Sequence, residues 1–332
     1  MERVHFLNVK NGDCSWIQHA SGRNTIIDIC NGNEVIDLTE RFNEMLKNDA
    51  VLGSLSGNYG YKNHPTDPLI YFRQHSMPKK IFRFILTHPD MDHLDGLNNL
   101  ITNYEIVNFW DTDNNKQLNR ESFGAQYKYD DWLAYQRLRK KTSGPKTLNL
   151  YNGAEGPEYT NDGLEILSPT PELVAYAKEH NDYNTSSYVV LYTTTTGRKV
   201  LFCGDSDKKA WESIMNLYSD KVKDIDVLIA SHHGRKSGGC AEHLGILKPK
   251  LTLFGNASSD HLDYSSWNNR GLRHITNNQA GNIVLTFDEL GDIGIYVENS
   301  AFAKKYNIYS CYSEKYRAYF ICKIMEVLIR IS

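Results

Sequence analysis

Short apolar runs separated by polar turns recur along the chain and predict many β-strands. Residues 4–9 and 15–19 alternate apolar and polar side chains around Asn11-Gly12-Asp13, a pattern typical of a hairpin. Residues 282–287 and 293–297 predict a closing hairpin in the same way. Other runs of strand length lie at 25–29, 80–86, 105–110, 163–168, 188–192, 199–203, 226–230 and 251–254.

Apolar positions three or four residues apart predict helices between these strands. Leu94, Leu97, Leu100 and Ile101 show this spacing, and further helices are predicted at 35–46, 123–141 and 207–218. Near the end of the chain, aromatic residues predict a C-terminal helix that packs on this chain or on a partner. They are Tyr306, Tyr309, Tyr312, Tyr316, Tyr319 and Phe320.

Composition places the 332 residues among ordinary globular proteins, with 40% hydrophobic and 23% charged residues. A net charge of -3 argues against binding nucleic acid through overall charge, although a local basic channel remains open. The six cysteines are scattered without a C-x-x-C pair, which suits a reducing compartment. The N-terminal residues lack the apolar core of a signal peptide, and no apolar run is long enough to cross a membrane. We therefore expect a cytoplasmic protein without a membrane partner.

The strongest chemical signal is His88-x-Asp90-x-Asp92-His93, which lies between a predicted strand and a predicted helix. Pro89 disfavours a helical conformation at His88, so this histidine should remain at the carboxyl edge of the sheet. Two imidazoles and two carboxylates form the mixed donor set of hydrolytic zinc, manganese or iron sites. The alternative is that the acidic residues only cap the helix.

This motif resembles the signature of metallo-β-lactamase-fold hydrolases, in the variant where Asp90 replaces the usual second histidine. That variant is typical of the ComEC-like branch, named for the hydrolase domain of a bacterial DNA-uptake channel. The opening segment, from Phe6 through Gly12-Asp13 to Asp28, is similar to the same branch. Asp28 ends an apolar triplet, where a buried carboxylate needs partners. We interpret it as a support for the metal turn rather than as a ligand.

The resemblance implies further ligands at later strand ends. Asp205 follows Gly204 after a strand and is expected to bridge two metals, with a helix cap as the alternative. Ser231-His232-His233-Gly234 is similar to a histidine-pair motif of the branch. We take His232 as a metal ligand and His233 as a neighbour of the substrate, a choice that the sequence leaves open. Asn184 stands where most of these enzymes carry a histidine, so it is assigned to substrate binding.

Substrate contacts are predicted on the loop after the histidine pair, where Arg235, Lys236 and Ser237 suit an anionic group such as phosphate. His261, in a polar loop at the same sheet edge, is predicted as a general acid or substrate contact, or as a loop residue without a role. The predicted catalytic residues are thus Asp92, Asp205 and His261. The predicted metal ligands are His88, Asp90, Asp92, His93, Asp205 and His232.

The order of these ligands at strand ends fits an αββα sandwich of two mixed sheets with helices outside. We expect one hydrolase domain over 1–297, with insertions near 34–79 and 111–162, and a helical appendage over 298–332. The expected cofactor is a pair of divalent ions, zinc or manganese, that activates water to attack a phosphodiester. The resemblance to the ComEC-like branch implies a nucleic acid or nucleotide as the substrate, so the enzyme would be a phosphodiesterase or nuclease. Two alternatives remain: a hydrolase of a small nucleotide or ester, such as a lactonase, and a catalytically silent regulatory subunit whose tail is a docking or self-association element.

Overall fold

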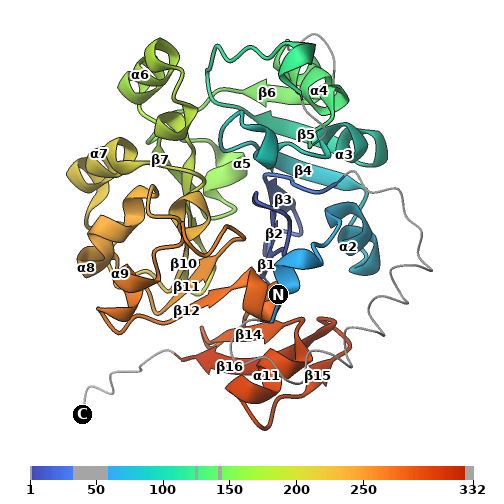
Figure 1. The fold of residues 1–332 in the computed structure, drawn as a ribbon, viewed down its shortest axis with the longest axis vertical. Helices are drawn as coiled ribbons and strands as arrows, with labels where there is room; N and C mark the ends of the chain where they lie inside the picture. Colours follow the sequence, from blue (N-terminus) through green and yellow to red (C-terminus); the bar gives the residue numbers. More distant parts are fainter. Residues whose placement is uncertain (1, 33–58, 124–125, 141–143, 326–332) are drawn as a thin grey trace.

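Two β-sheets pack face to face at the centre of the molecule, and helices cover their outer faces (Figure 1). The computed structural model describes residues 2–32, 59–123, 126–140 and 144–325. This arrangement is the αββα sandwich that the sequence predicts. The predicted helix at 35–46 lies outside the described residues.

The large sheet contains ten strands among the described residues, in the spatial order β15-β16-β14-β13-β1-β2-β3-β4-β5-β6. The strands from β3 to β6 are parallel, and the other pairs are antiparallel. The bounds are β1 Arg3–Phe6, β2 Ser15–Gln18, β3 Asn24–Ile27, β4 Lys80–Ile85, β5 Glu105–Trp110, β6 Lys146–Leu148, β13 Ile283–Phe287, β14 Ile293–Val297, β15 Tyr312–Ser313 and β16 Ala318–Ile324.

The smaller sheet has six strands within the described part of the chain, in the order β12-β11-β10-β9-β8-β7. The strands from β9 to β12 are parallel, so their carboxyl ends lie at one edge. The bounds are β7 Leu164–Ser168, β8 Val189–Thr193, β9 Lys199–Phe202, β10 Val227–Ile229, β11 Leu251–Phe254 and β12 His274–Thr276.

Three helices cover the outer face of the large sheet: α2 (Pro68–Gln74), α3 (Leu97–Asn103) and α4 (Tyr129–Arg139). On the other side of the molecule, α7, α8 and α9 pack on the smaller sheet (Figure 1). The remaining bounds are α5 Pro157–Thr160, α6 Pro171–His180, α7 Lys208–Tyr218, α8 Leu244–Leu247, α9 Tyr264–Asn268, α10 Asn277–Ala280 and α11 Ser300–Tyr306. None of the helices in the described ranges is long and apolar enough to cross a membrane.

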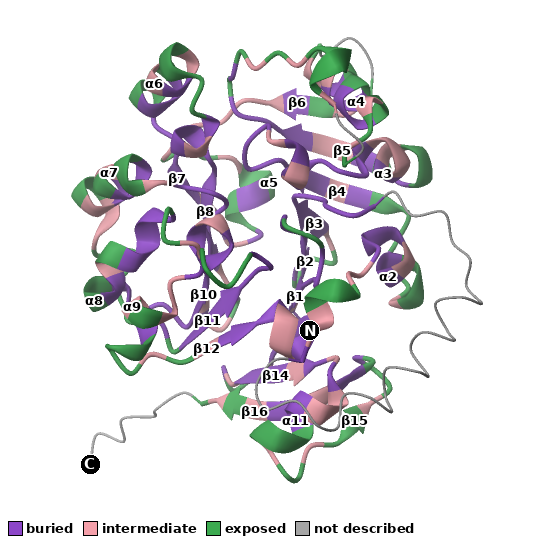
Figure 2. Cartoon of the chain, viewed as in Figure 1, coloured by how far each residue is buried: buried purple, intermediate pink, exposed green. Residues whose placement is uncertain are grey.

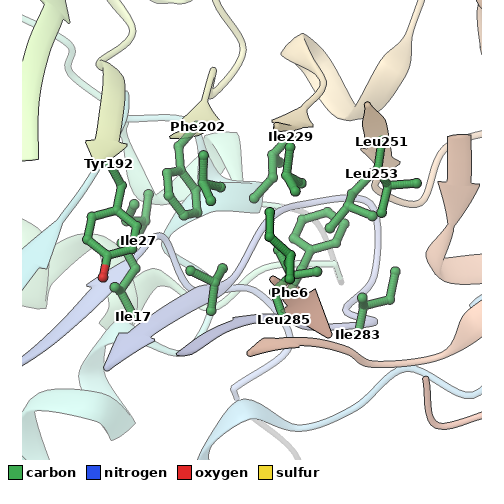
Figure 3. Packing of buried hydrophobic residues seen from close by; sticks show 14 of the residues in the cluster. Phe6, Ile17, Ile27, Tyr192, Phe202, Ile229, Leu251, Leu253, Ile283 and Leu285 are labelled. Atoms are coloured by element: carbon green, nitrogen blue, oxygen red, sulfur yellow. The ribbon is translucent and has the colours of Figure 1, made fainter. Parts of the chain in front are cut away.

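The main core lies between the sheets, where side chains from both inner faces meet (Figure 3). Phe6 and Leu285 of the large sheet point toward Phe202, Ile229 and Leu253 of the smaller one. Fully burying one such side chain contributes about 1.5–3 kcal/mol, so this layer accounts for much of the stability. Buried residues run through the strands, while exposed residues are concentrated on the outer helices and loops (Figure 2).

The C-terminal segment differs from the predicted helical appendage. It is helical at α11, but β16 then pairs with β14 and extends the large sheet. An unpaired β14 would leave open hydrogen-bonding groups at the sheet edge, and β16 satisfies them. In the region 111–162, which we expected to be an insertion, β6 extends the opposite edge of the same sheet.

Candidate metal centre

The two sheets bring four strand ends to one rim of the sandwich. Asp28 follows β3 and His88 follows β4, and these neighbouring strands are parallel. Asp205 follows β9 and His232 follows β10, which are also parallel neighbours. The first motif continues into a single 3₁₀ turn, η3 (Met91–His93), before α3 begins. Segments far apart in the sequence therefore present their polar side chains to the same place.

Four side chains from these segments form a compact donor cluster: Asp92, His93, Asp205 and His233. One donor atom of each lies within 4.8 Å of those of the other three. Asp205 Oδ1 lies 3.3 Å from His93 Nε2 and 3.6 Å from His233 Nε2. His233 Nε2 lies 3.9 Å from Asp92 Oδ2. Two imidazoles and two carboxylates at these separations suit zinc or manganese.

The fit to a cation is supported by buried atoms that make no hydrogen bond. They are His88 Nε2, His93 Nε2, His233 Nε2 and Asp205 Oδ1, all among the described residues. A buried polar atom without a hydrogen bond is costly. A divalent ion held by Asp92, His93, Asp205 and His233 would satisfy three of these atoms, while His88 Nε2 lies outside that group.

Asp28 fixes the ring of His93, since it accepts a hydrogen bond from His93 Nδ1 (2.8 Å). It also accepts from the backbone N–H of Thr87 and from the Thr87 hydroxyl, both at 2.7 Å. Because the hydroxyl proton goes to Asp28, Thr87 Oγ1 accepts from His88 Nδ1 at 3.2 Å. Both rings therefore keep Nε2 free to bind a metal. These contacts are typical of a supporting residue. Asp28 also belongs to a second group of possible metal ligands, with Asp13 and His93.

The two histidines of the second motif differ in their partners. His233 Nδ1 donates to Asp13 Oδ1 at 3.0 Å, which leaves Nε2 aimed into the cluster. His232 Nε2 lies 3.4 Å from Asp205 Oδ2 but accepts from an Arg235 guanidinium nitrogen at 3.3 Å. Its Nδ1 lies 2.8 Å from Ser237 Oγ. The geometry thus favours His233 as the ligand and His232 as the residue beside the substrate, the reverse of our assignment from the sequence.

An unusual backbone conformation presents this histidine pair. His232 has φ 52° and His233 has φ 58°, so both lie in the left-handed region that L-residues avoid. Each such residue costs about 1–2 kcal/mol. Two consecutive left-handed residues bring both rings to within 4 Å of Asp205.

The charged groups of the cluster shift one another's pKa values. Burial alone would raise the pKa of Asp205, but the adjacent His233 and His93 hold it well below its usual range. Burial disfavours the charged form of His93, yet Asp205 and Asp28 outweigh it and raise its pKa well above the ordinary value. The pKa of His233 is raised for the same reason, by Asp205 and Asp13. Burial and the neighbouring His93 lower the pKa of His88. Metal binding at this site would release protons from the imidazoles.

The other predicted residues lie at the margin of the cluster. Asp90 Oδ2 is 3.9 Å from His88 Nε2, and its other oxygen pairs with Lys116. Asn184 lies half-buried in the 3₁₀ turn η5 (Tyr183–Ser186), and no side-chain hydrogen bond involves it within the described ranges. Arg235 is half-buried beside His232, while Lys236 and Ser237 are exposed on the same loop. His261 is exposed; its carbonyl accepts from the Lys236 N–H at 2.9 Å. In the parts of the chain that the structure describes, no recorded contact joins its ring to the cluster.

Sequence reasoning gave no site role to Asp13 or Lys116. Asp13 belongs to the opening segment that resembles the ComEC-like branch, and this position could have indicated a role in the site. Lys116 lies in an irregular loop after β5, where no pattern distinguishes it from a solvated lysine.

No family model matches the chain, and no curated protein sequence matches it. Solved structures that resemble it include CmlA, a diiron β-hydroxylase from Streptomyces venezuelae, at 12% identity and a TM-score of 0.43 over 82% of this chain and 52% of CmlA. The chain therefore spans about half the length of that protein. A diphosphatase from the PhnP family matches at 11% identity and a TM-score of 0.41, over 86% of this chain and 97% of the other. A metallo-β-lactamase from Cronobacter sakazakii, solved as a motif mutant, matches at 9% identity and a TM-score of 0.34. The match covers 73% of this chain and 79% of the other. These similarities are too low to assign an activity to the chain.

Proposed function

We propose that this chain is a metal-dependent hydrolase of the metallo-β-lactamase type, similar to the ComEC-like branch, and that it cleaves phosphodiesters in a nucleic acid or nucleotide. The observation that carries the proposal is the convergence of His93 Nε2, His233 Nε2 and Asp205 Oδ1, which are buried without a hydrogen bond, with Asp92 beside them. Two divalent ions, zinc or manganese, are proposed to share Asp205. One would lie in the compact cluster, and the other between His88 and Asp90.

A bound divalent ion would supply an activated water and stabilise negative charge on the group under attack. The residues of the chain prepare the site for this chemistry. Asp13 and Asp28 hold the ligand rings in one orientation and keep Nδ1 protonated. Because these partners are buried and fixed, the site needs little rearrangement when substrate binds.

The preference for an anionic substrate is supported by the cations at the rim. Arg235 reaches His232 Nε2, which in turn lies 3.4 Å from Asp205, so the guanidinium is next to the centre. Its Nε is buried without a hydrogen-bond partner among the described residues. A phosphoryl oxygen would accept from this group, and exposed Lys236 and Ser237 stand on the same loop.

An activity panel tests the proposal, with plasmid DNA, single-stranded DNA, RNA, cyclic nucleotides and a lactone as substrates, each with manganese or zinc. We expect phosphodiester cleavage that Asp92→Ala abolishes and that Asp220→Asn, an exposed carboxylate after α7, leaves unchanged. Turnover of the lactone or of cyclic nucleotides alone would favour the small-substrate hydrolase. Cleavage that persists in Asp92→Ala would reject the proposed site.

Metal content, measured together with turnover, separates the enzyme from a silent regulatory subunit. The wild-type chain is expected to retain zinc or manganese after dialysis, and Asp205→Ala is expected to lose it. Mass spectrometry of both proteins, with Asp220→Asn as the control, measures the difference. Bound metal without turnover of any substrate would favour the regulatory role.

A further inference from the structure

The His88 side of the centre contains a cation that belongs to the chain itself. Lys116 Nζ forms a hydrogen-bonded ion pair with Asp90 Oδ1. The other oxygen of the same carboxylate, Oδ2, faces His88 Nε2 at 3.9 Å. The Lys116 side chain is 17% exposed and the Asp90 side chain 38%, so water partly screens this ion pair. One proposed metal ligand is therefore already engaged by an ammonium group.

A network of hydrogen bonds fixes the loop that carries Lys116. The Lys116 backbone N–H donates to Asn114 Oδ1 at 3.1 Å, and the Asn114 amide donates to the Tyr135 hydroxyl at 2.8 Å. Arg139 donates to the Asn114 carbonyl and forms an ion pair with Asp111 at 3.2 Å. Tyr135 and Arg139 belong to α4, so this helix sets the position of the lysine.

A second element, the turn η5, also contacts the ammonium. Lys116 Nζ lies 5.3 Å from the centre of the Tyr183 ring, within the range of a cation–π contact. The Tyr183 hydroxyl donates to Asn115 Oδ1 at 3.0 Å, which ties this turn to the lysine loop. Tyr183 immediately precedes Asn184, where the family resemblance leads one to expect a histidine ligand. An aromatic face suits an ammonium group, whereas divalent zinc or manganese is bound by imidazole and carboxylate groups.

The compact cluster offers a contrast. Asp92, His93, Asp205 and His233 place four donor atoms together, and within the described residues no lysine or arginine forms an ion pair with either carboxylate of this set. The two halves of the centre therefore differ in the number of available donors and in local charge.

We propose that Lys116 is a built-in counter-ion at the His88–Asp90 position, and that it makes the two metal positions unequal. The first ion binds at the Asp92/His93/Asp205/His233 cluster. A second ion binds only when it displaces the Lys116 ammonium from Asp90, because the two cations compete for one carboxylate. This inference rests on the proposed function, since it concerns the same metal centre.

Metal titration of the apo-protein, followed by calorimetry and by metal content after dialysis, tests the inference without an activity assay. We expect the wild type to bind one zinc or manganese ion tightly and a second at least about tenfold more weakly. Lys116→Met removes the charge and keeps the length of the side chain, and it should tighten the second ion by at least about tenfold. Lys116→Arg keeps the charge and should leave the second ion as weak as in the wild type.

Lys178→Met is the matched control, because Lys178 forms a 2.8 Å ion pair with Asp113 outside the donor cluster. Its two metal affinities should equal those of the wild type. Thermal unfolding checks that each variant is folded, and Lys116→Gln replaces Lys116→Met if the latter is not. Two equally tight ions in the wild type, or an unchanged second affinity in both neutral variants, would overturn the inference and leave the proposed function standing. A wild type that binds no ion at all would overturn both.

Discussion

His233 Nδ1 lies 3.0 Å from Asp13 Oδ1, although the two residues are 220 positions apart in the chain. Asp13 precedes β2 in the large sheet, and His233 follows β10 in the smaller one. The contact therefore crosses the sandwich and fixes the orientation of a proposed metal ligand from the opposite sheet. It makes the geometry of the centre depend on how the two sheets pack.

Asp13→Asn tests this dependence. The amide keeps the size of the side chain but removes the negative charge that holds Nδ1–H in place, so His233 loses its fixed orientation. We expect metal affinity to fall by about 10–100-fold. Calorimetric titration with zinc or manganese measures the change, and thermal unfolding should show that the variant is folded. Asp220→Asn serves as the control, and an affinity equal to wild type in both variants would rule out the orienting role.

The histidine pair gives a second prediction. Arg235 engages His232 Nε2, whereas His233 Nε2 is free within the described residues. His233→Gln should therefore reduce the metal content after dialysis, while His232→Gln should retain the metal and raise KM for an anionic substrate. Metal analysis and steady-state kinetics on the two variants distinguish the roles. The assignment from geometry is wrong if His232→Gln loses the metal and His233→Gln keeps it.

The strand pattern and the two motifs were sufficient to predict the αββα sandwich and the positions of His88, Asp92, His93 and Asp205, because residues at parallel strand ends meet at one edge. The roles of His232 and His233 could not be chosen from sequence, since they depend on two left-handed residues that no periodicity reveals. Side-chain contacts between the two sheets, such as Asp13 with His233, also could not be predicted from the sequence pattern.

The C-terminal tail and Lys116 illustrate two other limits. Aromatic residues three or four apart in the tail suggested a helix, but the unpaired edge of β14 selected a strand over Ala318–Ile324. Tertiary pairing overrode the local pattern. Lys116 lies in a loop without periodicity, and only its distance to Asp90 and Tyr183 indicates a role.

A buried histidine away from the centre predicts how stability depends on pH. Burial lowers the pKa of His5 from 6.5 to about 3, and the ring stacks on Trp16 with its Nδ1 2.9 Å from the Tyr71 hydroxyl. The folded state keeps His5 neutral, while the unfolded chain takes up a proton below pH 6.5. The contribution of neutral His5 to the free energy of unfolding is thus present above pH 6.5 and is lost as the pH falls toward 3.

His5→Gln should make the free energy of unfolding less dependent on pH in this window, by up to about 1.4 kcal/mol per pH unit. Urea unfolding between pH 4 and 7 measures the slope for the wild type and the variant. His180→Gln, at the exposed end of α6, is the control and should leave the slope unchanged. Parallel pH profiles for wild type and His5→Gln would show that His5 does not titrate as described.

Gly204 gives the last prediction, because it joins backbone conformation to the metal centre. Its φ is +48°, and a Cβ atom at this position would lie 2.9 Å from the Cβ of Thr87. Thr87 donates to Asp28 and accepts from His88, so a shift of Thr87 would disturb both. Gly204→Ala should cost about 1–2 kcal/mol for the left-handed backbone, with the steric contact in addition. We also expect it to weaken metal binding.

Gly197→Ala is the matched control, since Gly197 also has a positive φ, +82°, but a Cβ there meets nothing within 4 Å. It should lower the free energy of unfolding through the backbone alone and leave metal affinity unchanged. Urea unfolding and metal titration of both variants separate the backbone effect from the steric one. Equal losses of stability with unchanged metal affinity would mean that the close approach of Gly204 to Thr87 does not shape the centre.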